Sequence, residues 1–170
     1  MRPARLWNLI VPIWDSPAIV RSVADAEHSP LPLASLLRLA RNTLARVIRS
    51  ALGEAGFDDL PANGPYVISA TSVAGVPLAA IIEHLGLSKQ ASGHLVDLLV
   101  LRGYLDRTVD AEDRRRLIVS PTERGTAAAR VIRTAADGLE ARLLASVGAS
   151  DLEATRRTLA CLAAMTPGDA

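Results

Sequence analysis

The sequence predicts a mostly α-helical fold that contains one small β-hairpin. Alanine, leucine and arginine are abundant, and all three favour helices. Apolar residues recur three and four positions apart along most of the chain. Only residues 104–109 and 117–120 form short runs typical of strands. A chain of 170 residues with 49% hydrophobic residues is long enough to bury a core without a disulfide or a metal.

The composition excludes several classes of protein. Cys161 is the single cysteine, so neither an intramolecular disulfide nor a cysteine-based metal site can form, and we expect it to be a buried structural thiol. His28, His84 and His94 do not have the spacing of metal ligands, so no metal or cofactor is expected. No run approaches the ~18 apolar residues of a membrane span. The net charge of +1 means that any nucleic-acid site must be a local patch. A cytoplasmic protein is predicted.

Residues 1–32 differ from the rest and are predicted to form an N-terminal arm. A secretory signal shares part of the pattern, but its apolar run is short and is broken by Asn8 and Pro12. Trp7 and Trp14 are costly to leave in water, so we expect the arm to pack on the body or on a partner subunit. The two prolines in 29–32 mark its end.

A long helix is predicted from Leu33 to about Phe57, with apolar residues on one side. Its arginines are expected to form a solvated face: Arg38, Arg41, Arg46 and Arg49. A loop and a short helix from Pro65 to about Ser72 follow.

The next segment predicts two helices joined by a tight turn. The first covers Leu78–Leu85, and Gly86 supplies the turn because glycine accepts a positive φ. Ser88 is predicted to cap the second helix, which continues to about Arg102. We expect its inner face to carry Ala91, Leu95, Leu98 and Leu99. Helix, glycine turn and helix together are the helix-turn-helix pattern.

A β-hairpin is predicted directly after the second helix. Gly103 ends that helix, and the runs 104–109 and 117–120 flank the charged tip Asp110–Arg116. A hairpin in this place is a wing, so the predicted fold is a winged helix-turn-helix.

Two further helices are predicted to follow the hairpin. Ser120, Pro121 and Glu123 have the pattern of a capping box at the start of the first, which continues to about Val147. Residues 150–153 repeat the pattern, and the last helix ends near Met165. The apolar stripes of the terminal helices are too long for one small domain to cover, so a homodimer is expected to bury them.

The winged helix predicts a DNA interface. The second helix would place its N-terminal residues in the major groove, where Gln90 can bind adenine and Lys89, the only lysine of the chain, can bind guanine or phosphate. The expected recognition residues are Ser88, Lys89, Gln90, Ser92, Gly93 and His94. The wing would contribute Asp113, Arg114, Arg115 and Arg116, with arginine suited to a narrow minor groove. Taken singly, each of these features is also typical of a solvated surface.

The segment from about Leu78 to Gly125 resembles the MarR family of bacterial transcriptional regulators. The resemblance rests on LAAIIEHLGLSKQASGHLVDLLVLRGYLDR at 78–107 and DAEDRRRLIVSPTERG at 110–125. It implies a homodimer with interlocked terminal helices, a palindromic DNA site and an anionic aromatic effector between the dimer and DNA lobes. It also implies that Arg115 enters the minor groove and that Asp113 braces it. Gly93 and Pro121 depart from the family pattern.

These observations predict four regions and one function. The regions are the arm (1–32), an N-terminal dimerisation helix (33–60), a DNA-binding lobe (61–122) and C-terminal dimerisation helices (123–170). The predicted function is a sequence-specific DNA-binding regulator, a dimeric repressor of a palindromic operator that a small ligand releases. The alternative is a winged-helix protein-interaction module that does not bind DNA. An enzyme is not expected, because no nucleophile–base pair or phosphate-binding glycine loop is present.

Overall fold

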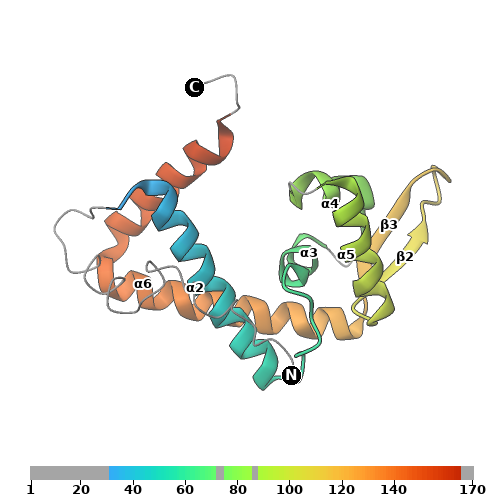
Figure 1. The fold of residues 1–170 in the computed structure, drawn as a ribbon, viewed down its shortest axis with the longest axis horizontal. Coiled ribbons are helices and arrows are strands. Elements are labelled where there is room, and N and C mark those ends of the chain that lie inside the picture. Colours follow the sequence, from blue (N-terminus) through green and yellow to red (C-terminus); the bar gives the residue numbers. More distant parts are fainter. Residues whose placement is uncertain (1–30, 72–74, 86–87, 166–170) are drawn as a thin grey trace, which may run out of the picture. The chain divides into compact units, whose positions relative to one another are not determined.

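The computed structural model describes residues 31–71, 75–85 and 88–165 and confirms a mostly α-helical fold with a β-hairpin (Figure 1). The chain divides into two units, Met1–Ala45 and Arg46–Ala170. Its elements are α2 (Leu33–Glu54), α3 (Gly64–Ala70), β1 (Val76–Pro77), α4 (Leu78–Leu85), α5 (Lys89–Leu101), β2 (Leu105–Val109), β3 (Leu117–Pro121) and α6 (Glu123–Ala164). The predictions for residues 1–30, including Trp7 and Trp14, and for Gly86 fall outside the described residues.

Helix α2 confirms the predicted long helix, although it ends at Glu54, before the expected Phe57. Its four arginines are exposed, as expected for a solvated face: Arg38, Arg41, Arg46 and Arg49. None of the helices in the described ranges is both long enough and apolar enough to cross a membrane.

The wing belongs to a three-stranded antiparallel sheet with the order β1-β3-β2. Strand β3 pairs with β2 through Leu105↔Pro121 and Val109↔Leu117, and with β1 through Val76↔Val119. The predicted hairpin is therefore confirmed, and β1 is an addition. Two residues are too few to show an alternating pattern, which is why the sequence did not predict β1.

The helix-turn-helix lobe has its core between α3, α4, α5, the sheet and the start of α6. Its fully buried side chains come from all of these elements: Val67, Ile68, Ile81, Val96, Leu99, Tyr104, Leu105, Val119 and Ala128. On α5 the buried face carries Ser92, Leu95, Val96 and Leu99. The prediction that Ala91 lies on this face is wrong, because Ala91 is exposed.

Helix α6 begins two residues later than a start at Pro121 would require. Thr122 is its cap, and the Thr122 hydroxyl accepts a hydrogen bond from the backbone N–H of Gly125 at 3.1 Å. The predicted capping box at Ser120 is wrong, because Ser120 and Pro121 pair with β2 as the last residues of β3. Ser120 is therefore paired with Asp106 in the sheet and does not cap the helix.

The predicted pair of C-terminal helices is confirmed as two helical segments of α6 that meet at Gly148. This residue has φ 81° and ψ 166°, a conformation that glycine adopts without the steric cost of a side chain. Figure 1 shows α6 changing direction along its length. Arg156 and Glu140 form an ion pair of 2.6 Å across the bend. Cys161 is exposed in the second segment, so the expected burial of its thiol is wrong for the single chain.

Candidate nucleic-acid interface

The first turn of α5 presents polar side chains to solvent. The Ser88 hydroxyl accepts a hydrogen bond from the backbone N–H of Ala91 at 3.2 Å, which confirms Ser88 as the cap. Ser88, Lys89, Gln90 and His94 are exposed. This set combines a cation and an amide at a helix N-terminus, which is suited to an anionic partner.

Two of the predicted recognition residues differ from the others. Ser92 has no exposed surface and belongs to the core, so the prediction that it faces outward is wrong. Within the described residues its hydroxyl has no hydrogen-bond partner. Gly93 is partly exposed, and a Cβ placed there would meet no other part of the described chain within 4 Å. Packing among the described residues therefore does not require a glycine at this position.

The wing tip is a tight turn organised by two aspartates. The Asp113 carboxylate accepts a hydrogen bond from the backbone N–H of Arg115 at 3.0 Å, and the Asp113 carbonyl accepts one from the N–H of Arg116 at 2.8 Å. Asp110 lies 3.9 Å from the Arg116 side chain. Arg114, Arg115 and Arg116 are all exposed. Asp113 thus fixes the backbone from which Arg115 projects, and the guanidinium stays accessible.

An ion pair joins the recognition helix to the wing. Arg107 of β2 donates to the Asp97 carboxylate of α5 at 2.5 Å. The sequence analysis missed this pair, because the two residues lie ten positions apart in different elements and no pattern links them. The contact connects the surface of α5 to the strand that leads to the wing tip.

A second polar cluster lies where α5, β2 and α6 meet. The Tyr104 hydroxyl donates to the Asp59 carboxylate at 2.5 Å, and Arg124 of α6 donates to the same oxygen at 3.0 Å. The hydrogen bond from Tyr104 lowers the pKa of Asp59; desolvation opposes this, and the charges of Arg124 and Arg102 add to the lowering. Burial, followed by the bond to Asp59, raises the pKa of Tyr104 to about 12.

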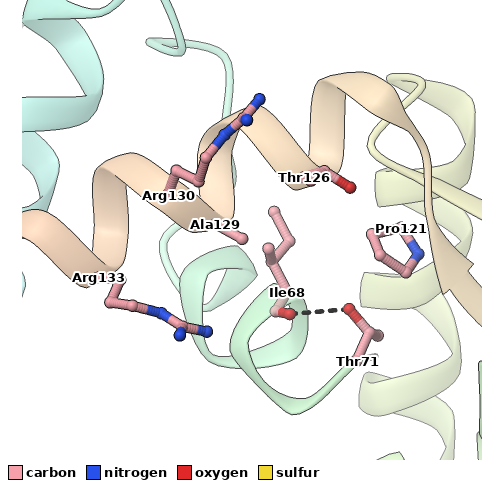
Figure 2. Close-up of a pocket in the computed structure, with 7 residues that line it drawn as sticks. All are labelled: Ile68, Thr71, Pro121, Thr126, Ala129, Arg130 and Arg133. Atoms are coloured by element: carbon pink, nitrogen blue, oxygen red, sulfur yellow. Dashed lines mark hydrogen bonds between the residues drawn. The ribbon is translucent and has the colours of Figure 1, made fainter. Parts of the chain in front are cut away.

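A pocket of about 450 Å³ lies where α3 meets α6 (Figure 2). Ile68 and Ala129 form an apolar wall, and Arg130 and Arg133 extend on different sides of it. The Thr71 hydroxyl at its edge donates to the Ile68 carbonyl at 2.7 Å. Cations around an apolar wall suit a small anionic ligand with an apolar body. No pattern in the sequence had singled out these lining residues. No group of residues in the described ranges could hold a metal ion.

Comparisons with known proteins agree with this architecture. Residues 59–116 match a model described as MarR family. No curated protein matches the sequence.

Solved structures share the fold over most of the chain. MepR from S. aureus, solved with DNA, is 18% identical and has a TM-score of 0.65. The match covers 78% of this chain and 96% of that chain. FabT from Streptococcus pneumoniae, also solved with DNA, is 16% identical, with a TM-score of 0.66 and coverages of 76% and 92%. CouR from Rhodococcus jostii RHA1, bound to p-coumaroyl-CoA, is 22% identical, with a TM-score of 0.63 and coverages of 79% and 94%. Residues 59–116 are thus similar to the MarR family, and the chain shares the winged-helix fold of these solved structures.

Proposed function

We propose that the chain is a cytoplasmic, non-enzymatic transcriptional regulator that binds a palindromic DNA operator as a homodimer. The observation that carries this proposal is the joint exposure of the polar start of α5 and of the arginines at the wing tip, on elements that Arg107 and Asp97 tie together. Residues 61–122 would form the DNA-binding lobe. Residues 33–60 and 123–170 would form the dimer.

Each exposed group has a defined role in the proposed complex. Gln90 offers the donor and acceptor that an adenine edge requires, and Lys89 offers a cation to guanine or to phosphate. The free N–H groups at the start of α5 bind a phosphate. Arg115 enters the minor groove, where a narrow groove concentrates negative potential. Ser92 has no role in this interface, because it is buried.

The homodimer is supported by the apolar surface of α6. Leucines and other large apolar side chains are exposed along its later part: Leu143, Leu144, Val147, Leu159, Leu162 and Met165. A patch of this kind on a helix is typical of an interface between subunits. A two-fold dimer would set two recognition helices about one DNA turn apart, ~34 Å, which requires an operator with inverted half-sites.

The pocket beside Arg130 and Arg133 supports release by a small anionic ligand, an aromatic acid or its derivative. CouR, which shares the fold, is bound to p-coumaroyl-CoA. A ligand that binds more tightly to a form with the wrong spacing between recognition helices shifts the population away from the operator. The chain would then act as a repressor that its ligand releases.

The test is selection of bound sequences from a random pool of DNA duplexes, followed by titration of the enriched duplex. We expect an inverted repeat. Arg115→Ala is expected to weaken its binding about 10-fold or more, since a lost groove contact costs roughly 1–3 kcal/mol. Arg49→Ala, which removes an exposed arginine from the solvated face of α2, is the matched control and should bind like wild type. Equal affinity of the Arg115 variant and wild type would contradict the proposal.

The alternative function is a protein-interaction module without DNA binding. The net charge of +1 and the glycine within the recognition helix, Gly93, favour it. Salt separates the two functions, because phosphate contacts release counterions and the affinity for DNA falls steeply as salt rises. Failure to enrich any duplex, together with weak binding at all salt concentrations, would support the interaction module.

A further inference from the structure

Asp59 accepts hydrogen bonds from three side chains that belong to other parts of the lobe. It lies in the loop between α2 and α3. Its carboxylate accepts from the Tyr104 hydroxyl at 2.5 Å and from Arg124 at 3.0 Å, and its backbone carbonyl accepts from Arg102. Arg102 caps the C-terminal end of the recognition helix α5, and Arg124 is the second residue of α6. One residue therefore holds the end of one helix and the start of the other.

The three donors also contact one another. The Arg124 guanidinium lies 4.3 Å from the centre of the Tyr104 ring and donates to the Arg102 carbonyl at 2.6 Å. Phe57, from the same loop as Asp59, packs on Tyr104 with 6.2 Å between ring centres. The carboxylate thus accepts from one guanidinium group and lies near the charge of a second, beside the fully buried Tyr104 ring.

The other contacts between the start of α6 and the turn after α5 all involve the backbone of Gly103 and Tyr104. Thr122 donates from its backbone N–H to the Tyr104 carbonyl at 3.1 Å and from its hydroxyl to the Gly103 carbonyl at 2.6 Å. Gly125 approaches so closely that a Cβ there would overlap the Tyr104 carbonyl oxygen. These contacts fix where the two segments cross. Asp59 joins this junction from a third segment, the loop between α2 and α3, through the side chains of Tyr104 and Arg124.

The angle between α5 and α6 matters because α6 is a long lever. Its first segment, of about 25 residues, spans roughly 37 Å, so a rotation of about 5° at the junction moves the far end by about 3 Å. In a dimer that joins through the far part of α6, the same rotation changes the distance between the two recognition helices. Both half-sites must be engaged together for tight binding.

We propose that Asp59 is a positioning residue for DNA binding, whose carboxylate fixes the angle between the recognition helix α5 and helix α6 and thereby the spacing of half-sites that a dimer accepts. This inference rests on the proposed function. The expected change in affinity has the opposite direction from a purely electrostatic effect. Removing the negative charge of Asp59 would by electrostatics alone strengthen binding to DNA, whereas loss of positioning weakens it.

The experiment compares wild type, Asp59→Asn and the control Asp58→Asn, which removes the neighbouring exposed carboxylate. Each is titrated with the enriched inverted repeat, with repeats whose spacer is one base pair shorter or longer, and with a single half-site. Asp59→Asn should weaken binding to the best repeat about 10-fold, flatten the preference among spacers and leave half-site binding within about twofold, since only simultaneous engagement is affected. Asp58→Asn should behave like wild type.

Tyr104→Phe is the second variant in case Asp59→Asn folds poorly. It keeps the ring and removes one of the two bonds to the carboxylate, so a smaller change in the same direction is expected. Thermal melts and the mass of the dimer in solution are measured for every variant. Equal spacer preference in the Asp59 and Asp58 variants, or a loss of melting temperature without a change in spacer preference, would overturn the inference. If wild type enriches no duplex, the proposed function is itself wrong and the inference falls with it.

Discussion

Helix α5 and the far segment of α6 carry leucines at similar spacing but bury them to different degrees. On α5, Leu95 is 9% exposed and Leu99 is fully buried. On α6, Leu159 is 39% exposed and Leu162 is 40% exposed. An apolar stripe at helical spacing indicates that one face of the helix is buried. It does not indicate whether the same chain or another molecule covers that face. Contacts within the chain cover the first stripe, whereas the second is exposed and would be covered by another copy of the chain in the proposed dimer.

This difference predicts that the two regions depend on different interactions, contacts within one chain for the lobe and association of two chains for the far segment of α6. The winged-helix lobe has its own core and should fold at any protein concentration. The far segment of α6 should be stabilised by association, so its stability should rise with the concentration of protein. Variants in the two regions therefore give different readouts, and the following predictions use this contrast.

The largest effect is expected from Leu162→Glu in the far segment of α6. A carboxylate buried at an apolar interface without a partner costs several kcal/mol, so the dimer dissociation constant should rise about 100-fold or more. Analytical ultracentrifugation over a range of concentrations measures it. Leu101→Glu makes the same change at an 82% exposed leucine at the end of α5 and should leave the dimer intact. A dimer unaffected by Leu162→Glu would show that this segment is not the interface.

A smaller effect is expected from pH within the lobe. The pKa of Tyr104 is raised from 10.0 to about 12 in the folded chain. Its contribution to stability is therefore complete below pH 10 and is lost as the pH rises through about 12. Two pKa units correspond to roughly 2–3 kcal/mol of unfolding free energy. Urea unfolding between pH 9 and 12 should show this loss in wild type and not in Tyr104→Phe.

Asp59, the acceptor of the same hydrogen bond, affects the unfolding free energy at acid pH. There the stability falls as the pH falls, whereas for Tyr104 it falls as the pH rises. The pKa of Asp59 is lowered, so its contribution is present above the ordinary carboxyl value and disappears as the pH falls through the lowered one. Asp59→Asn should therefore lose stability at neutral pH and converge with wild type in acid. Parallel curves for the two proteins would show that the carboxylate is not bonded in solution.

The sequence was sufficient to predict the order of the helices and of the two hairpin strands, though not β1, because caps and breakers mark most of their ends. Ser88 caps α5 as predicted, and the bend at Gly148 lies between the predicted end of one helix near Val147 and the predicted start of the next at about residue 150. The cluster around Asp59 could not be predicted, since its members lie up to 65 positions apart and only the tertiary fold joins them. The ion pair between Asp97 and Arg107 could not be predicted for the same reason. The dimer and the DNA contacts remain predictions.

The rotational phase of α5 was the principal error in the candidate site, and its cause is physical. Ala91 and Ser92 are both small, so neither marks the apolar face strongly, and the polar hydroxyl favoured an outward position for Ser92. The face is set by Leu95, Val96 and Leu99, which place position 92 one turn earlier on the same side. The sequence analysis had counted Leu98 and not Val96 in that face.

This correction leads to the smallest predicted effect. The buried Ser92 hydroxyl has no hydrogen-bond partner among the described residues, and an unsatisfied buried polar group destabilises a fold. Ser92→Ala should therefore raise the unfolding free energy by about 1 kcal/mol, since the helix also favours alanine. Its affinity for the enriched duplex should equal that of wild type, because the side chain does not reach the surface. Gln90→Ala, on the exposed side of the same helix, should give the reverse result: nearly unchanged stability and weaker binding. Reduced DNA affinity in a fully folded Ser92→Ala protein would contradict this prediction.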